Sequence, residues 1–358
     1  MSRQVKTPRF YVDMPTFLHA TGMTGWENTE LLYMNPSNPH LRQTSSNTMF
    51  IIGGANEFPK TSFPINFVAL LNHNLASDNN NCRVIGKYTG SSHSLCNNNL
   101  GFTEVLNANH YEAGDNDFID PSYNGTSIWT LNTLNRDWTS FELKFSDGFD
   151  DYTHQLGSLV VGKYWDAPNS PDLNLTMSRR FEGIKRQKTI NGKILANTYY
   201  DGPTEWTMNP KTNDFGGSAT YKYPPFELDT TAHVDSEGYR FDYRAKSGLG
   251  RKGLRSWKLT FSYIGESDMW IDNEVSNTLT SDDVTPNNDI PNPMLSDNSF
   301  NFVWNCTLGG TLPFIFTDDK DSNAPDRYAI CTFRGNSLSV KQVAHNTYSL
   351  SITIDEVA

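Results

Sequence analysis

The sequence predicts a mainly β protein, with an N-terminal jelly-roll or β-sandwich domain followed by a second β-rich domain of the α+β class. Short apolar segments rich in Val, Ile, Phe, Trp and Thr recur along the chain, separated by turns rich in Asn, Gly, Ser and Asp. A helical pattern is clear at one place, near residues 298–308. The 8 Trp, 16 Tyr and 21 Phe supply enough apolar surface for a folded core.

The first stretch, residues 1–44, is predicted to be an irregular N-terminal arm. Proline removes a backbone donor and breaks regular elements. This stretch contains prolines at four positions, Pro8, Pro15, Pro36 and Pro39.

Residues 45–168 are predicted to form the jelly-roll β-sandwich, because several short strands with few helical patterns are typical of that architecture. The stretch FELKF (141–145) alternates apolar and charged residues, which predicts a half-buried strand. The predicted strands lie in NTMFIIGG (47–54), INFVALLNHNL (65–75), CRVIGKYTG (82–90), TSIWTLN (126–132), WTSFELKF (138–145) and LGSLVVGKYW (156–165).

Residues 169–358 are predicted to be a β-rich assembly domain, joined to the first by the linker DAPNSPDLNL that starts at Asp166. Its one helix is expected near 298–308, where apolar residues recur at helical spacing before two glycines. Long polar stretches are expected to be functional or ordered by partners, at 209–250 and 272–297. The predicted strands lie in SWKLTFSYI (256–264), LPFIF (312–316), RYAICTF (327–333) and TYSLSITI (347–354).

Composition excludes several classes of protein. The net charge of -11 argues against non-specific nucleic-acid binding, which needs Lys and Arg to displace counterions. No apolar run is long enough to span a membrane, and the N-terminus has no apolar core of a secretion signal. The four cysteines have no metal-binding spacing and are expected to be free thiols, at Cys82, Cys96, Cys306 and Cys331.

His73 follows the apolar run at Phe67 and invites two interpretations. It could be a general base near Asp78, or a strand-end residue whose ring nitrogens bind nearby polar groups. No nucleophile motif accompanies it. We therefore favour the second interpretation, a polar lock at the end of a buried strand.

A calcium site is the one metal hypothesis. In DDKDSNAPD, Asp319, Asp321 and Asn323 alternate as at the start of a calcium loop. The sixth position is Ala324 instead of Gly, and the twelfth is Ile330 instead of Glu, which excludes an EF-hand. A looser calcium site stays open, and no other cofactor is expected.

Other chemistry has little support in the sequence. Acidic pairs such as Asp150-Asp151 and Asp282-Asp283 are expected by chance among 40 acids, so no glycosidase pair can be nominated. The glycine-rich SGLGRKG (247–253) follows no strand and is expected to be a surface loop or a contact to an acidic partner. Aromatic residues near turns could stack on sugars, although most must be core: Trp26, Trp165 and Trp206.

The order FVALLNHNL, CRVIGKYTG, WTSFELKF and LGSLVVGKYWDAPNSPDLNL resembles a jelly-roll module of tailed-phage virion proteins, similar in architecture to galactose-binding domains. RSWKLTFSYI and the block from Gly309 to the C-terminus look like structural proteins of marine tailed phages, especially cyanophages. The element order there is similar to tail-tube and distal-tail domains. The resemblance covers about 45–355 and implies a structural signature, with no catalytic residues, at Asn72, His73, Asn74, Gly162, Tyr164, Arg255, Trp257, Pro313 and Phe314.

This resemblance implies a non-enzymatic structural component of a tailed-phage virion, in the tail or baseplate. Its expected partners are copies of itself and other virion proteins, and its expected location is the particle. An alternative is a carbohydrate-binding protein of the particle that recognises host surface glycans. A tail-borne hydrolase is a third hypothesis, for which the sequence nominates no residues.

Overall fold

The protein is mainly β in a computed structural model, and every described strand pair is antiparallel. Among the residues described, no helix has the length and apolarity needed to cross a membrane. The structure describes residues 5–20, 34, 40–43, 48–52, 65–73, 75, 82–88, 91–97, 100–113, 116–122, 125–132, 138–145, 153–180, 184–198, 253–271 and 298–357.

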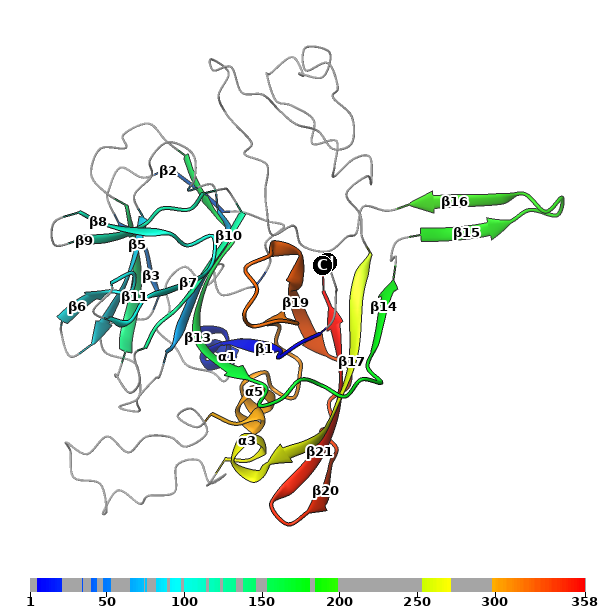
Figure 1. Cartoon of the computed structure of the whole chain (residues 1–358). Coiled ribbons are helices and arrows are strands. Elements are labelled where there is room, and N and C mark those ends of the chain that lie inside the picture. Colours follow the sequence, from blue (N-terminus) through cyan, green and yellow to red (C-terminus); the bar gives the residue numbers. More distant parts are fainter. Residues whose placement is uncertain are drawn as a thin grey trace.

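One sheet of eleven strands, here called the large sheet, runs through the molecule (Figure 1). The strand β20 (Val340–Ala344) pairs with one side of β21. The order of the other ten is β14 (Thr176–Arg180), β17 (Leu254–Gly265), β21 (Thr347–Glu356), β19 (Tyr328–Phe333), β18 (Phe314–Thr317), β1 (Arg9–Asp13), β13 (Ser158–Asp166), β4 (Phe67–His73), β10 (Gly125–Thr130) and β7 (Thr103–Leu106).

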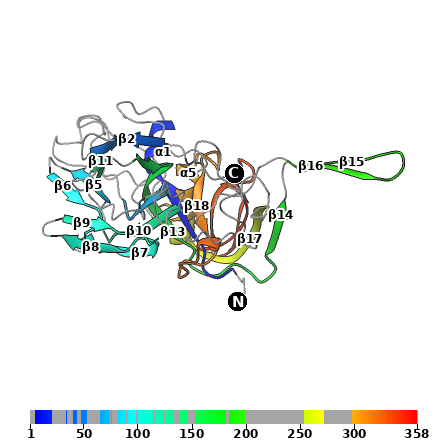
Figure 2. The ribbon, with the colours of Figure 1, turned by 90° about the horizontal axis from the view of Figure 1, so that it is seen from above.

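A second sheet of six strands, here called the small sheet, lies beside the β13–β4–β10 part of the large sheet (Figures 1 and 2). The described residues also form two separate strand pairs, β2 (His40–Gln43) with β12 (Thr153–Leu156), and β15 (Ile184–Lys188) with β16 (Ile194–Thr198). The small sheet contains β3 (Thr48–Ile52), β11 (Trp138–Phe145), β5 (Cys82–Tyr88), β9 (Asn116–Ile119), β8 (His110–Ala113) and β6 (Ser91–Ser94).

The two sheets share one apolar core, as a β-sandwich requires. Val68 and Leu70 of β4 belong to the same buried cluster as Val84 and Phe141 of the small sheet. Phe67, Ala69 and Leu71 lie on the opposite face of β4 in a second buried cluster. Both faces of this strand are therefore covered, which explains its uninterrupted apolar run. The jelly-roll topology itself stays a prediction.

The strand FELKF departs from the half-buried pattern. Phe141 is buried as expected, but Glu142 on the other face is buried as well. The Glu142 carboxylate forms ion pairs with Lys87 and Lys144. One lysine of the adjacent strand β5 and one of β11 itself thus compensate the buried charge, which the alternation alone could not indicate.

The N-terminal arm is the main correction to the sequence prediction. Residues 9–13 form β1, which pairs with β13 on one side and β18 on the other. They are followed by α1 (Met14–Ala20). Pro8 precedes the strand and Pro15 lies in the first helical turn, where a missing N–H is tolerated. The prolines therefore delimit regular elements instead of preventing them.

The large sheet also continues across the predicted boundary near residue 168, since β1 joins β13 to β18. The expected linker is attached to the body. Asp172 N–H donates to Thr260 O at 2.8 Å, and Asp172 Oδ2 accepts a hydrogen bond from the Ser262 hydroxyl. Whether the parts fold as separate domains, and the likeness to tail-tube domains, stay predictions.

The expected helix is present as α5 (Phe300–Cys306), and a shorter helix α3 (Glu266–Met269) follows β17. Gly309 and Gly310 have φ values of 66° and 88°, a left-handed conformation that ends helices and favours glycine. The ring of Phe300 packs edge-on against Phe10, with centroids 6.1 Å apart. The helix thus covers β1.

The hairpin of β15 and β16 projects away from both sheets (Figures 1 and 2). Of its side chains, those at 187–194 are described, and none of these belongs to either buried cluster. Its strands pair from Ile184 with Thr198 to Lys188 with Ile194.

Candidate functional site

His73 ends β4 inside the protein and has no solvent exposure. Leu75 N–H donates to His73 Nδ1 at 3.3 Å, so the ring proton is on Nε2. His73 Nε2 lies 2.8 Å from Ser127 Oγ and donates to it. The Ser127 hydroxyl donates in turn to Asn107 O at 2.6 Å. The three hydrogen bonds run in one direction and join β4, β10 and the residue after β7.

This geometry agrees with the polar lock and not with a catalytic pair. A serine nucleophile needs an imidazole nitrogen that accepts its proton. Here both nitrogens of His73 are committed, and Ser127 gives its proton to a backbone carbonyl. Burial also lowers the pKa of His73 to about 3. Asp78 lies outside the described residues.

The backbone conformation of Asn72 directs the His73 imidazole toward Ser127. Its φ of 54° is left-handed, a conformation that Asn adopts more readily than most residues. The register between β4 and β10 shifts there, with Gly125 opposite His73 and Ser127 opposite Leu70. Such a bulge redirects the following side chain. Asn74, the third residue of the predicted element, lies outside the described residues.

The lock predicts how stability depends on pH. The folded protein keeps His73 neutral, whereas the unfolded chain takes up a proton below about pH 6.5. The contribution of His73 is therefore complete above that pH and is lost as the pH falls. Between about pH 6.5 and 4, the free energy of unfolding should fall by about 1.4 kcal/mol per pH unit more steeply in the wild type than in a His73→Gln variant.

Urea titrations at about pH 5 and about pH 7.5 measure this difference. Comparison with the variant is needed because burial raises the pKa of Asp13 to about 7. The contribution of Asp13 has the opposite sign, since it is lost as the pH rises from about 4 to about 7. Parallel pH profiles for wild type and variant would contradict the lock.

Gly162 and Tyr164 both hold β1 against β13. A Cβ atom on Gly162 would lie 2.0 Å from Val12 O, so only glycine allows this approach. The Arg9 guanidinium lies over the Tyr164 ring at 4.0 Å, and Arg9 Nη2 donates to Asp166 Oδ2 at 2.9 Å. These two signature residues therefore have a structural role in the described fold.

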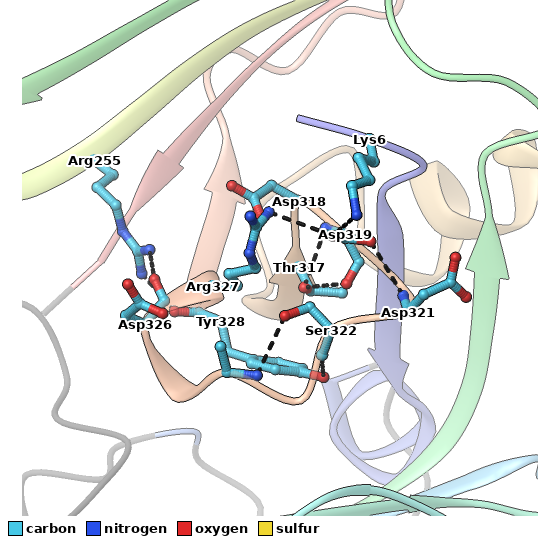
Figure 3. Close-up of polar contacts among 11 residues, drawn as sticks. Lys6, Arg255, Thr317, Asp318, Asp319, Asp321, Ser322, Asp326, Arg327 and Tyr328 are labelled. Carbon is cyan, nitrogen blue, oxygen red and sulfur yellow. Dashed lines mark hydrogen bonds and ion pairs between the residues drawn. The ribbon is translucent and has the colours of Figure 1, made fainter. Parts of the chain in front are cut away.

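Arg255 and Trp257 lie on β17, which pairs with the C-terminal strand β21. Figure 3 shows Arg255 beside the loop that contains Asp326. Arg255 Nη2 donates to Glu356 Oε1 at 2.7 Å, and its Nε and backbone N–H both donate to Glu356 Oε2. Arg255 Nη1 also donates to Asp326 O at 2.6 Å. Its guanidinium lies 5.1 Å from the buried Trp257 ring. This ion pair joins β17, β21 and the loop before β19.

Glu356→Gln is expected to lower the free energy of unfolding by about 3 kcal/mol, because it leaves the Arg255 charge buried without its counter-charge. Chemical denaturation measures the change. Asp355→Asn is the matched control. Asp355 is the residue before Glu356, and it forms its ion pair with the exposed Arg334. A clearly smaller loss is expected there. Equal losses would show that burial of the Glu356 pair is unimportant.

Lys6, Asp319 and Arg327 form the centre of a second charged group (Figure 3). Lys6 Nζ lies 2.9 Å from Asp319 Oδ2, and Arg327 Nη1 lies 3.6 Å from the same oxygen. Arg327 also pairs with Asp318 at 3.0 Å. Asp321 N–H donates to Asp319 Oδ1 at 3.3 Å. The group ties the N-terminal residues to the loop between β18 and β19.

This arrangement gives the calcium hypothesis no support. Asp319 faces two cationic side chains, which a divalent cation would have to displace. The Asp321 side chain is 76% exposed, and Asn323 is exposed too, so the three candidates do not converge. Within the described ranges, no three His, Cys, Asp or Glu side chains are grouped to hold a metal ion. Of the alternating residues at 319, 321 and 323, Asp319 pairs with Lys6 and Arg327, and the other two are exposed to solvent.

Pro313 comes directly before β18, and Phe314 is its first residue. Pro313 is half-buried and precedes the strand, where its missing N–H breaks no sheet hydrogen bond. Phe314 is buried 4.6 Å from Phe333 and 5.6 Å from Phe10, measured between ring centroids. Both residues thus belong to the packing around β1.

The cysteines are free thiols, as predicted. Burial raises the pKa of all four, and that of Cys96 to about 12. The thiolate is the reactive form of cysteine. These side chains are therefore inert core residues in the folded protein.

Other predicted candidates do not form a site in the described part of the chain. Trp165 is buried 5.6 Å from Phe10 and cannot stack on a sugar. Among the exposed large apolar side chains described, Tyr263 is the one aromatic. The remaining candidates lie outside the described residues: Trp26, Trp206, Asp150-Asp151, Asp282-Asp283, 209–250, 247–252 and 272–297.

Sequence reasoning missed the aromatic cluster around Phe10 and the pair of Arg9 with Asp166. The apolar run FYV between two prolines was the available signal for β1. The ion pair offers no signal, because its partners are 157 positions apart. No protein-family model, curated protein or solved structure matches this chain.

Proposed function

We propose that this chain is a non-enzymatic structural component of a tailed-phage virion that mediates subunit assembly in the tail or baseplate. The observation that carries the assembly role is the projecting hairpin of β15 and β16. A two-stranded hairpin alone is at best marginally stable in water. Contact with another subunit would supply the burial that the hairpin lacks within its own chain.

The state of the reactive groups supports a non-enzymatic role. His73 is locked by hydrogen bonds, and the four thiols are buried with raised pKa values. Asp319 and Glu356 are committed to cationic partners. An active site needs groups that remain available to a substrate, often in a cleft. These side chains instead join elements of the fold.

The virion part of the proposal rests on the resemblance of the NHNL element and the C-terminal block to phage structural proteins. In this proposal the chain is located in the particle. Its partners are copies of itself and other virion proteins. A protein of this kind needs a rigid body and outward contact elements, which suits a continuous sheet with a projecting hairpin.

Quantitative peptide mass spectrometry of gradient-purified particles from the source tests the proposal. The chain is expected in the particle fraction, at a fixed ratio to the most abundant particle proteins across independent preparations. A soluble host enzyme of similar size serves as the control for carry-over. Recovery of the chain in the soluble fractions together with this control would contradict the proposal.

A further inference from the structure

We propose that Asn191, at the tip of the hairpin of β15 and β16, is a site of spontaneous deamidation, which converts its side-chain amide into a carboxylate. Asn191 is followed by Gly192, and both residues are exposed. Ile190, on the other side of Asn191, is fully exposed as well. This inference concerns the chemistry of the chain itself and is independent of the proposed assembly function.

The nucleophile of this reaction is the backbone nitrogen of Gly192. After this nitrogen loses its proton to solvent, it attacks Cγ of Asn191, and a bond forms between the two atoms. The bond from Cγ to Nδ2 breaks, and ammonia leaves with a proton taken from water. A second water molecule then opens the five-membered imide ring at either of its two carbonyl carbons. The products are an aspartate and an isoaspartate, and nothing is oxidised or reduced.

Glycine at the following position favours the reaction, because it has no Cβ to obstruct the approach of its nitrogen to Cγ. The space around Gly192 is open. Apart from the two chain neighbours, no described heavy atom lies within 4 Å of a Cβ added there. Water therefore reaches both the nitrogen and the imide ring. Asparagine is accordingly counted among the thermolabile residues of proteins.

The closed turn opposes the reaction. Gly192 N–H donates to Thr189 O at 2.9 Å, which engages the nucleophilic nitrogen. Thr189 N–H donates to Lys193 O at 2.8 Å, and Lys193 N–H donates to the Thr189 hydroxyl at 3.0 Å. Gly192 has a φ of 78°, the left-handed position of a three-residue hairpin loop. The turn must therefore open before the nitrogen can attack.

Local opening of this turn is expected to be frequent. The hairpin projects from the two sheets, and its described side chains, at 187–194, belong to neither buried cluster (Figure 1). A two-stranded hairpin alone is at best marginally stable in water. Segments with few buried contacts open at a free energy far below that of global unfolding. The rate of deamidation at Asn191 should therefore approach the rate in the unfolded chain.

The chain contains its own matched control, because Asn-Gly occurs at one other place, Asn124-Gly125. Gly125 is the first residue of β10 and is buried opposite His73. Its nitrogen becomes accessible only when β10 separates from the large sheet, which is an opening of the core. The two pairs thus have the same reacting groups and differ in the elements that hold the nucleophilic nitrogen.

The test follows both asparagines in the full chain at mildly alkaline pH, in buffer and in concentrated guanidinium chloride. Mass spectrometry of peptides from an acidic digest measures the conversion of each amide, and chromatography separates the aspartate and isoaspartate products. The variant Asn191→Asp identifies the aspartate peptide. In buffer, Asn191 should convert at least about tenfold faster than Asn124, and in denaturant the two rates should agree within about threefold.

Retention of the Asn191 amide in buffer would overturn the inference, whatever happens in denaturant, because the turn would then be stable enough to protect it. Equal conversion of Asn191 and Asn124 in buffer would overturn it as well, because the exposed hairpin would then give no advantage. Neither result bears on the presence of the chain in particles. Failure of this inference is therefore distinct from failure of the proposed function.

Discussion

Replacement of Gly162 by Ala is expected to lower the free energy of unfolding by about 3 kcal/mol or more. The added Cβ would lie 2.0 Å from Val12 O and 3.1 Å from Met14 N. Both are backbone atoms, so no side-chain rotation can relieve the overlap. The strand β1 would have to move away from β13. Equilibrium denaturation in urea measures the loss.

Gly265→Ala is the matched control. Gly265 has a φ of -65°, and its added Cβ would meet only the tip of Asp268, at 3.3 Å. A change below about 1 kcal/mol is expected, because a side-chain tip can turn away. Similar losses in the two variants would mean that β1 does not approach β13 as described.

Phe10→Ala is expected to cost about 3–5 kcal/mol, the usual range for truncation of a fully buried phenylalanine. Phe10 has no solvent exposure and contacts five other rings, with centroids 5.2 to 6.1 Å away. The cavity would open at the junction of β1, β18 and α5. The five rings are those of Trp165, Phe300, Phe314, Phe316 and Phe333.

Tyr263→Ala is the control for this truncation, since Tyr263 is an aromatic residue on β17 with 73% exposure. Its loss should change stability by less than about 1 kcal/mol. If Phe10→Ala has as small an effect as Tyr263→Ala, residues 9–13 do not belong to the core, and the predicted irregular arm would be the better description.

The strands that sequence could predict share one property. All ten predicted segments contain a strand, and their apolar runs are long enough to be buried on one or both faces. The missed strands are short or polar, such as SSHS in β6 and TMSRR in β14. Such segments adopt strand geometry because a neighbouring strand pairs with them, and the local sequence carries little signal of that partner.

The same limit applies to the polar contacts. His73 could be predicted as a lock, because a polar residue that ends an apolar run needs hydrogen-bond partners. Its partner Ser127 is 54 positions away in the sequence, and the register of β4 with β10 brings the two residues together. Arg255 and Glu356 are 101 positions apart. Asp319 looked like a calcium ligand because its sequence neighbours do not include Lys6.

Cryo-electron microscopy of intact particles from the source tests the central claim most directly. We expect density for this chain in the tail or baseplate, repeated around a symmetry axis, with the projecting hairpin of β15 and β16 in contact with a neighbouring subunit. Particles without density for the chain would contradict the claim that it is a structural component of the virion.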